Sequence, residues 1–458
     1  MRDKKELKEV DMRILQVVHG YPPRYNAGSE VYTQTLCRAL AERHELMVFS
    51  RFEDAFLPVY TELKEHDPLG IRGRRIPLRL INLANFRDRY RHAAVDAAFV
   101  RCVEEFRPDI VHVQHLNHLS TSVVLEAARA GIPVVFTLHD FWPMCPRGQF
   151  IQFFPPDART VLPLCDGQED HKCAVRCYAR YFSGAPEEES ADVRFHADWV
   201  RRRMHHLRQV CDAVDRFIAP SRQLRERFVE EFNLPTERVA LLDYGFDLTR
   251  LHGRRRDRQR DEEFVFGYIG THVAAKGIHQ LLEAFARMNR PAKLRIWGRP
   301  NGESTPALKS LCDGFPPAIR ERITWEGEYF NAHIVPEVFN HVDAIVVPSI
   351  WLENSPLVIH EAQQARVPVV TADTGGMAEF VRHEENGLLF RHRDPASLAV
   401  QMTRCVDDPE WIARLGLRGY LHQESGNVPS IKAHSQAIEG IYHECLQANS
   451  ISTTEVRA

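Results

Sequence analysis

The sequence has no long apolar run and almost no net charge, and both features exclude whole classes of protein. No stretch of the 458 residues stays apolar over the roughly 20 residues that a membrane-spanning helix needs. The charged start, MRDKKELKEVD, lacks the apolar core of a signal peptide. With 59 basic and 62 acidic residues, the formal charge of -3 produces no overall field that would select nucleic acid. We therefore expect a cytoplasmic protein that binds no nucleic acid.

Cysteine is too sparse for a disulfide-stapled secreted domain, because only ten cysteines occur in the whole chain. The segment 145–178 has little apolar periodicity, so it cannot build a core of its own, yet it holds four of them: Cys145, Cys165, Cys173 and Cys177. Four soft ligands in such a segment predict a structural zinc site, with His171 able to replace one thiolate. An iron–sulfur cluster uses the same ligands, and reduced, unpaired cysteines are the alternative.

The chain is too long for one hydrophobic core, so we expect two domains. Residues 246–263 (FDLTRLHGRRRDRQRDEE) are dense in both charges and poor in apolar residues, which favours an interdomain linker. The predicted segments are an N-terminal domain 1–244 with the cysteine-rich insertion 145–178, a linker 245–263, a second domain 264–430, a helix 431–447 and a disordered tail 448–458.

Strands and helices alternate along the first half of the chain, as in a doubly wound α/β sheet. Apolar runs at 13–18, 109–114 and 133–138 predict buried strands. Gly28 lies in the loop after the first run, and His139 directly follows the third. Because open α/β sheets bind ligands at the carboxyl ends of their strands, His139 is a candidate site residue; a structural histidine is the alternative.

Two basic segments, 72–92 and 194–214, interleave arginines with apolar residues. Such a pattern fits a surface that contacts anionic lipid headgroups. It fits equally well a soluble flap in the first segment and a core-packed helix with a solvated basic face in the second. The two interpretations stay open.

The stretch 344–390 predicts a strand, a helix and a second strand, with two glutamates near one strand end. Its opening AIVVP is typical of a buried parallel strand. Ser355 before Pro356 reads as a hydroxyl cap followed by proline at the first helical position. Glu353 falls in the loop after the strand, and Glu361 between one and two turns into the helix. The helix-start N–H groups between them can bind a phosphate.

Further motifs follow in a fixed order. In sequence they are Glu353, Glu361, Pro368, Gly375-Gly376, Glu379 and Asn386-Gly387. As a set they resemble the carboxyl-terminal signature of GT-B retaining glycosyltransferases of family 4, the group 1 type. The resemblance implies an α/β GT-B fold: two doubly wound Rossmann-like domains with a cleft between them and a C-terminal crossing helix. In that fold, 1–244 would be the acceptor-side domain, 264–430 the nucleotide-sugar donor domain, and 431–447 the helix that crosses back to the first domain. It implies transfer of a sugar from a UDP- or GDP-linked donor to an acceptor hydroxyl, without a catalytic divalent metal.

The resemblance also implies residue roles. Glu361 would accept hydrogen bonds from the donor ribose and Glu353 from hydroxyls of the transferred sugar, while His139 would contact that sugar near its reacting carbon. The implied catalytic residues are Lys276, Glu353 and His139. The implied donor-binding residues are Gly28, Gly270, Lys276, Ser355, Pro356, Leu357, Glu361, Gly375 and Gly376.

The chain departs from the family pattern at the diphosphate. Lys276-Gly277 resembles the family's pair at a helix start, where the lysine and an arginine five residues earlier neutralise the leaving diphosphate. The earlier position here is Thr271, so Arg299 or His272 becomes the candidate second cation.

We expect a role in surface polysaccharide, lipid-linked glycan or glycoconjugate synthesis, in the cytoplasm or peripheral to the inner face of the membrane. A GT-B nucleotide-sugar epimerase is one alternative, and a glucan phosphorylase would need a pyridoxal lysine for which the sequence offers no position. A non-catalytic nucleotide-sugar-binding subunit is another, because Thr271 stands where the family has arginine.

Overall fold

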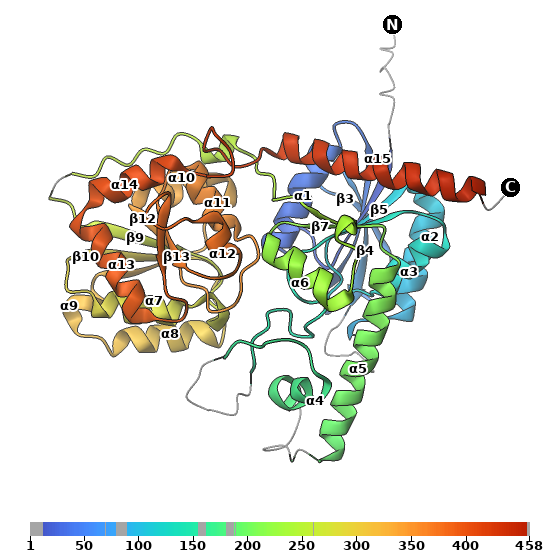
Figure 1. The fold of residues 1–458 in the computed structure, drawn as a ribbon, viewed down its shortest axis with the longest axis horizontal. Coiled ribbons are helices and arrows are strands. Elements are labelled where there is room, and N and C mark those ends of the chain that lie inside the picture. Colours follow the sequence, from blue (N-terminus) through green and yellow to red (C-terminus); the bar gives the residue numbers. More distant parts are fainter. Residues whose placement is uncertain are drawn as a thin grey trace, which may run out of the picture. The chain divides into compact units, whose positions relative to one another are not determined.

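A computed structural model describes residues 12–68, 70–78, 89–153, 162–179, 187, 189–259 and 261–455, with side chains as far as residue 450. The chain forms two compact units (Figure 1). Unit 1 comprises Met1–Gly245 and Ile431–Ala458, and unit 2 comprises Phe246–Ser430. Each is an α/β structure built on its own sheet, as the doubly wound prediction requires.

Unit 1 holds a sheet whose described strands run in the order β3-β4-β2-β1-β5-β6-β7-β8. All neighbouring pairs among them are parallel except β3 with β4. The central strands are apolar and buried because helices cover both faces of a parallel sheet. The strands are β1 (Arg13–Val18), β2 (Glu45–Glu53), β3 (Leu63–His66), β4 (Arg72–Leu78), β5 (Ile110–Val113), β6 (Val134–Thr137), β7 (Arg216–Ala219) and β8 (Val239–Leu241).

The helices of unit 1 follow the strands as crossover connections. Two of them begin at serine caps: the Ser190 hydroxyl accepts from the Val193 N–H and the Ser221 hydroxyl from the Leu224 N–H. The described helices are α1 (Gly28–Leu40), α2 (Ala93–Phe106), α3 (Ser122–Arg129), α4 (Asp170–Cys173), the π-helix η3 (Ala174–Tyr178), α5 (Ala191–Asp212), α6 (Arg222–Phe232), the 3-10 turn η5 (Thr236–Arg238) and α15 (Ile431–Glu455).

The last helix, α15, returns the chain to unit 1 and packs beside α1 (Figure 1). The Tyr32 hydroxyl lies 2.7 Å from His434 Nε2, and Arg43 pairs with Glu439. The helix continues to Glu455, past the residue where the sequence analysis begins a disordered tail. That tail is polar but contains neither glycine nor proline before Glu455, so nothing in it breaks the helix.

Unit 2 holds a sheet whose described strands are all parallel, in the order β11-β10-β9-β12-β13-β14. The strands are β9 (Phe264–Ile269), β10 (Ala292–Trp297), β11 (Ile323–Gly327), β12 (Ala344–Val347), β13 (Val369–Ala372) and β14 (Gly387–Phe390). The helices and 3-10 turns are η6 (Thr249–Leu251), η7 (Ala274–Lys276), α7 (Ile278–Arg287), α8 (Ser304–Asp313), α9 (Pro317–Arg320), η8 (Asn331–His333), α10 (Ile334–Glu337), η9 (Phe339–His341), α11 (Leu357–Gln364), α12 (Gly375–Phe380), α13 (Pro395–Asp407) and α14 (Pro409–Arg418).

The predicted cap of α11 is wrong. The helix begins at Leu357 with Pro356 as its N-cap residue, and no side chain makes a cap hydrogen bond. Ser355 is therefore one position too early to act as the hydroxyl cap, and proline sits just before the first helical residue rather than on it.

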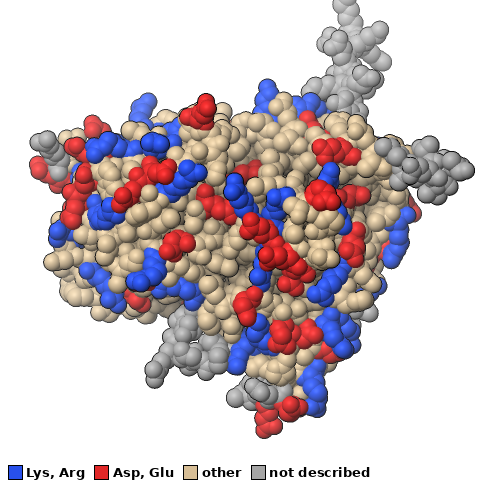
Figure 2. Space-filling model, viewed as in Figure 1, with Lys and Arg blue, Asp and Glu red and all other residues tan. Residues whose placement is uncertain are grey.

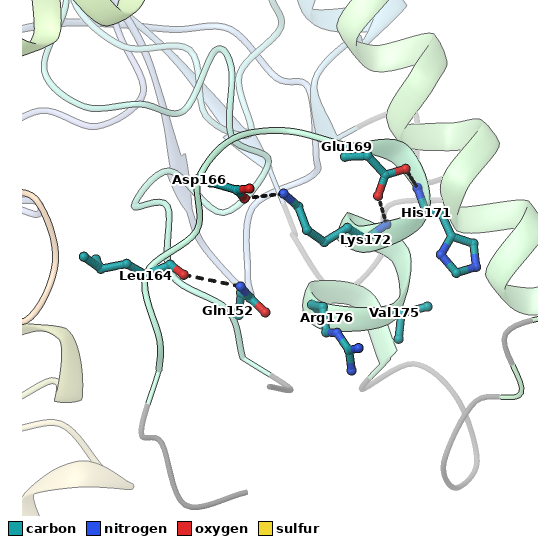
Figure 3. Close-up of a pocket in the computed structure, with 8 residues that line it drawn as sticks. All are labelled: Gln152, Leu164, Asp166, Glu169, His171, Lys172, Val175 and Arg176. Atoms are coloured by element: carbon teal, nitrogen blue, oxygen red, sulfur yellow. Dashed lines mark hydrogen bonds and ion pairs between the residues drawn. The ribbon is translucent and has the colours of Figure 1, made fainter. Parts of the chain in front are cut away.

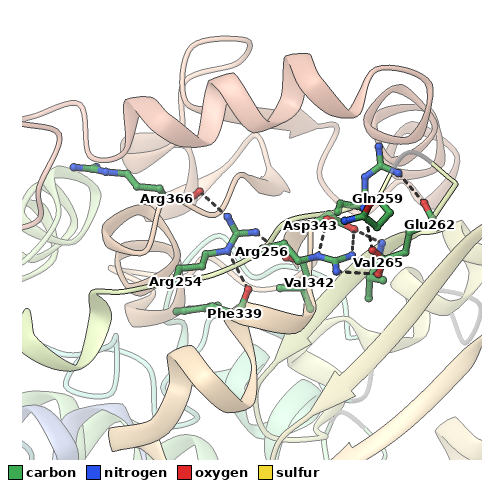
Figure 4. Close-up of polar contacts among 10 residues, drawn as sticks. Arg254, Arg256, Gln259, Glu262, Val265, Phe339, Val342, Asp343 and Arg366 are labelled. Carbon is green, nitrogen blue, oxygen red and sulfur yellow. Dashed lines mark hydrogen bonds and ion pairs between the residues drawn. The ribbon is translucent and has the colours of Figure 1, made fainter.

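The segment predicted as a linker, 245–263, lies along unit 2 instead of standing free (Figure 4). Arg254 donates to the Val342 carbonyl at 2.8 Å. Arg256 forks onto the Asp343 carboxylate, with Nε–Oδ1 and Nη2–Oδ2 distances of 3.0 Å. Since the chain is extended here, alternate arginines turn toward the unit. The charge density that predicted a linker thus supplies anchors.

Arginines of the two basic segments, 72–92 and 194–214, form ion pairs with acidic residues. Arg74 is 3% exposed and bonds Glu62 and Glu105, each at 2.5 Å, and Arg202 of α5 pairs with Asp198 at 2.7 Å. Figure 2 shows acidic and basic side chains interspersed over one face. Residues 79–88 of the first segment lie outside the described residues. Among those described, no helix combines the length and apolar character needed to cross a membrane. Membrane contact stays a prediction.

We predict that Arg256→Ala destabilises the protein by about 2 kcal/mol, because it strands the largely buried Asp343 carboxylate without its bidentate partner. Arg255→Ala is the matched control, since the neighbouring residue is exposed. Thermal unfolding of both variants tests this, and equal melting temperatures would contradict the anchoring role.

Candidate functional site

The loops at the carboxyl ends of β9, β10 and β12 meet so closely that two glycines are required there. A Cβ on Gly298 would lie 1.9 Å from the Gly270 carbonyl oxygen, and one on Gly277 would lie 1.8 Å from the Pro348 oxygen. Gly277 also has φ of +73°, in the left-handed region that favours glycine. The loops at this edge of the sheet are therefore in direct backbone contact, which brings the start of α7 to the loop after β12.

Glu353 is the centre of this edge. Its side chain is 6% exposed, and its Oε1 accepts hydrogen bonds from Lys276 Nζ and Ser349 Oγ, both at 2.6 Å, and from Trp351 Nε1 at 2.9 Å. Three donors on one oxygen compensate the cost of burying a charge. The structure thus brings together Lys276 and Glu353, two predicted site residues that lie 77 positions apart in the sequence.

The paired glycines hold the Glu353 loop from the other side. The Gly376 N–H donates to the Glu353 carbonyl at 2.7 Å, and a Cβ on Gly376 would fall 1.3 Å from the Asn354 oxygen. Gly375 has φ of +61°. These glycines thus let the start of α12 touch the backbone beside the buried carboxylate.

Glu361 lies on α11 and is paired with an arginine that the sequence analysis missed. Arg250 Nη2 lies 2.6 Å from Glu361 Oε1, and both side chains are largely buried. Burial, and next the Glu361 charge, raise the pKa of Tyr329, so a protonated phenol stands near the same carboxylate. Arg250 belongs to the segment interpreted as a linker, where its spacing from Glu361 in the chain gives no signal of contact.

The two candidate replacements for the missing arginine are engaged elsewhere in unit 2. His272 Nδ1 lies 3.3 Å from Thr305 Oγ1, its ring meets the Trp325 ring edge-on, and burial lowers its pKa. Arg299 pairs with Glu328 at 3.3 Å. Lys276 is therefore the cation that contacts Glu353 directly, and the second-cation role of His272 or Arg299 stays untested.

The other two predicted site residues belong to unit 1. Gly28 is the exposed first residue of α1. His139 follows β6, and both its ring nitrogens have partners: Nδ1 lies 2.7 Å from the Tyr244 hydroxyl and Nε2 lies 3.0 Å from Gln114 Oε1. Burial, and next the neighbouring His115, lower the pKa of His139 to about 3, so the ring is neutral at pH 7.

The four clustered cysteines line one small cavity, with Phe150 and Tyr178 among its other walls. Nevertheless, the described part of the chain contains no group of three or more His, Cys, Asp or Glu residues placed to hold a metal ion. Without a metal, burial, and next the Cys145 sulfur, raise the pKa of Cys177 to about 12. The zinc or iron–sulfur prediction is therefore not supported, and the cysteines are free thiols in an apolar pocket.

His171, predicted as a possible replacement for one thiolate, belongs to α4 and lines a separate surface pocket (Figure 3). The Glu169 carboxylate caps α4 there by accepting from the His171 and Lys172 N–H groups. Lys172 also reaches Asp166 at 2.5 Å. Local helix capping and an ion pair thus account for the charged residues of this turn.

Comparison with known proteins identifies the family. The model described as "Glycosyltransferase Family 4" matches residues 26–250, and the model described as "Glycosyl transferases group 1" matches residues 263–408, so together they match most of the chain. The chain belongs to the family 4, group 1 type glycosyltransferases with the GT-B fold.

Curated relatives match about half of their own length. D-inositol 3-phosphate glycosyltransferase of Nocardia farcinica is 28% identical over 47% of this chain and 50% of its own. Alpha-D-kanosaminyltransferase of Streptomyces kanamyceticus is 27% identical over 48% of this chain and 58% of its own.

Solved structures match along nearly the whole chain and share its fold. HepE of Anabaena, in complex with UDP and glucose, has a TM-score of 0.63 at 18% identity over 94% of this chain and 99% of its own. Sucrose-phosphate synthase of Thermosynechococcus elongatus has a TM-score of 0.64 at 18% identity over 95% and 99%. The predicted GT-B fold is confirmed.

We predict that Gly376→Ala costs about 3 kcal/mol or more, because its methyl group would overlap the Asn354 carbonyl and force the two loops apart. Gly302→Ala in the same unit is the control, since a Cβ there meets nothing within 4 Å. Chemical denaturation of both variants tests the claim; a Gly376→Ala variant as stable as the control would refute the close packing.

Proposed function

We propose that the protein transfers a sugar, with retention of configuration, from a nucleoside diphosphate sugar to an acceptor hydroxyl. The observation that carries the proposal is the pairing of Lys276 with buried Glu353 at the carboxyl edge of the unit 2 sheet. Sheets of this kind bind ligands at that edge. Glu361, on the helix that follows the same loop, supplies a second carboxylate for hydroxyl groups.

Lys276 serves the leaving diphosphate in this proposal. Negative charge grows on the leaving phosphate oxygen as the bond to the sugar breaks, and a nearby ammonium stabilises it. The Lys276 side chain is one-third exposed, so it can exchange its Glu353 partner for a phosphate. The N–H groups at the start of α11 add donors for the same anion.

The two carboxylates serve the sugars. When Lys276 turns to phosphate, Glu353 keeps Ser349 and Trp351 as donors and gains capacity to accept a hydroxyl of the transferred sugar. Arg250 occupies Glu361 Oε1, which holds the carboxylate in place and leaves Oε2 to accept from the ribose. The resemblance gives His139 the contact with the transferred sugar near its reacting carbon, and in this proposal it acts as a neutral ring. No protein nucleophile is assigned.

The donor we propose is UDP- or GDP-linked, and no catalytic divalent metal is required. The HepE structure, which holds UDP and glucose, supports the nucleotide-sugar class. The acceptor is a glycan or lipid-linked hydroxyl, in surface polysaccharide or glycoconjugate synthesis on the cytoplasmic side of the membrane. The names of two relatives, a D-inositol 3-phosphate glycosyltransferase and an alpha-D-kanosaminyltransferase, differ, so the proposal takes neither the sugar nor the acceptor from them.

Glu361→Ala is expected to lose donor binding, because the ribose loses its acceptor and Arg250 is left without its partner. Glu361→Gln, which keeps the shape, should weaken binding less. Titration calorimetry with the nucleoside diphosphate measures both, and unchanged affinity in the alanine variant would refute the ribose role.

Lys276→Ala is expected to lower kcat about a hundredfold with a smaller change in donor KM, because charge on the phosphate develops mainly in the transition state. Lys293→Ala, an exposed lysine on β10, is the control. Transfer assays with excess acceptor measure the effect. Wild-type turnover in Lys276→Ala would contradict the assignment, and nucleotide binding without transfer in the wild type would favour a non-catalytic subunit.

A further inference from the structure

Unit 1 buries polar side chains in the middle of its sheet, where apolar residues are expected. Gln16 on β1, His112 on β5 and Gln114 just after β5 are 0% exposed, and Thr137 at the end of β6 is 1% exposed. Burying such groups is costly unless each is hydrogen-bonded. The hydrogen bonds of these side chains therefore indicate a role that apolar residues could not fill.

The amides form a chain that runs from α15 to His139. Gln16 Nε2 donates to the Tyr442 hydroxyl at 3.3 Å, and Gln114 Nε2 donates to Gln16 Oε1 at 2.9 Å. Gln114 Oε1 then meets His139 Nε2 at 3.0 Å. His112 Nδ1 closes the α15 end at 2.6 Å from the Tyr442 hydroxyl. Every link lies within unit 1.

The donor and acceptor directions along this series of hydrogen bonds determine which ring nitrogen of His139 carries the proton. An amide oxygen can only accept, so His139 Nε2 carries the hydrogen and donates to Gln114 Oε1. Nδ1 then accepts from the Tyr244 hydroxyl. The amides point the same way, and aligned hydrogen bonds reinforce one another. Both the tautomer and the ring orientation of His139 follow from this arrangement.

A second contact of α15 reaches the same ring from the side. His434 Nε2 bonds the Tyr32 hydroxyl at 2.7 Å, and the Tyr32 ring meets the His139 ring edge-on with centroids 5.2 Å apart. The Tyr442 side chain is 0% exposed and His434 2% exposed, so neither can turn to water. The helix that returns to unit 1 thus contacts the surroundings of His139 at two points.

We propose that α15 positions His139 through the chain Tyr442, Gln16 and Gln114, with Gln114 as the positioning residue that fixes the ring. The inference rests on the proposed function only in one respect, namely that His139 contacts the transferred sugar. The carboxyl-terminal helix then serves the reaction, because a transferase that loses it loses the orientation of a ring in unit 1.

The test uses the full chain with ¹⁵N-labelled histidine and reads the ring nitrogens of His139 by NMR. Tyr442→Phe removes one hydroxyl and keeps the packed ring. Glu439→Gln is the matched control on the same helix, because it weakens the ion pairs with Arg43 and His44 but removes none of the hydrogen bonds between Tyr442 and His139. Gln114→Glu replaces the amide by a carboxylate that cannot donate to Gln16.

The wild type is expected to show His139 as the Nε2–H tautomer. The ionisable groups that influence the pKa of this ring are His115 and His19, which lower it, and Asp140 and Glu30, which raise it. Gln114→Glu adds a carboxylate at hydrogen-bond distance, so the pKa must rise and His139 must gain a proton on lowering the pH where the wild type does not.

Tyr442→Phe is expected to shift the His139 ring signals and to lower kcat about tenfold at unchanged donor KM, whereas Glu439→Gln changes neither. An Nδ1–H tautomer in the wild type, or identical His139 signals in Tyr442→Phe and Glu439→Gln, would overturn the proposal. If the wild type shows the expected NMR pattern but no transferase activity, the hydrogen-bond series from Tyr442 to His139 is supported and the proposed function is contradicted.

Discussion

A carboxylate can be buried as an anion only if hydrogen-bond donors replace the water it loses, and the carboxyl edge of unit 2 is arranged around that requirement. Glu353 has three donors on one oxygen, from the start of α7 and from its own loop. Gly277 lets the backbone before α7 touch the loop after β12, which brings Lys276 to the carboxylate, and Gly376 lets the start of α12 touch the same loop from its other side. Removing the carboxylate would leave Lys276 without the partner that holds it at the site.

The same requirement recurs at two other buried carboxylates of unit 2. Asp343 at the start of β12 is held by Arg256, and Glu361 on α11 is held by Arg250. Both arginines come from the segment with which unit 2 begins, Arg250 from the 3-10 turn η6 and Arg256 from the extended chain after it. This segment therefore supplies counter-charges as well as connection. In unit 1, buried Arg74 is held by Glu62 and Glu105, and the buried amides of Gln16 and Gln114 are joined by a hydrogen bond. Each pairing fixes an orientation as well as an ionisation state.

The fold and the motif residues could be predicted because they depend on local pattern. Buried strands are short apolar runs, and the ordered set from Glu353 to Gly387 marks the family whatever the loops between them do. The pairing of Arg250 with Glu361 joins residues 111 positions apart, and no periodicity signals it. Two predictions from local pattern were wrong. Ser355 beside Pro356 suggested a helix cap, yet the helix starts one residue later. The charge density of 245–263 suggested a free linker, yet its arginines anchor it to unit 2. The four cysteines do share a cavity, but their geometry does not make a metal site.

The central claim is that unit 2 binds a nucleoside diphosphate sugar, with Lys276 and Glu361 contacting its nucleoside diphosphate part and Glu353 its sugar. The most direct test is a thermal-shift screen of the full chain against UDP, GDP and ADP without added divalent metal. A ligand at a hundred times its dissociation constant stabilises the folded state by about 2.7 kcal/mol. We expect one nucleotide to raise the melting temperature and Glu361→Ala to abolish that rise. No shift with any of the three, or an equal shift in Glu361→Ala, would contradict the account.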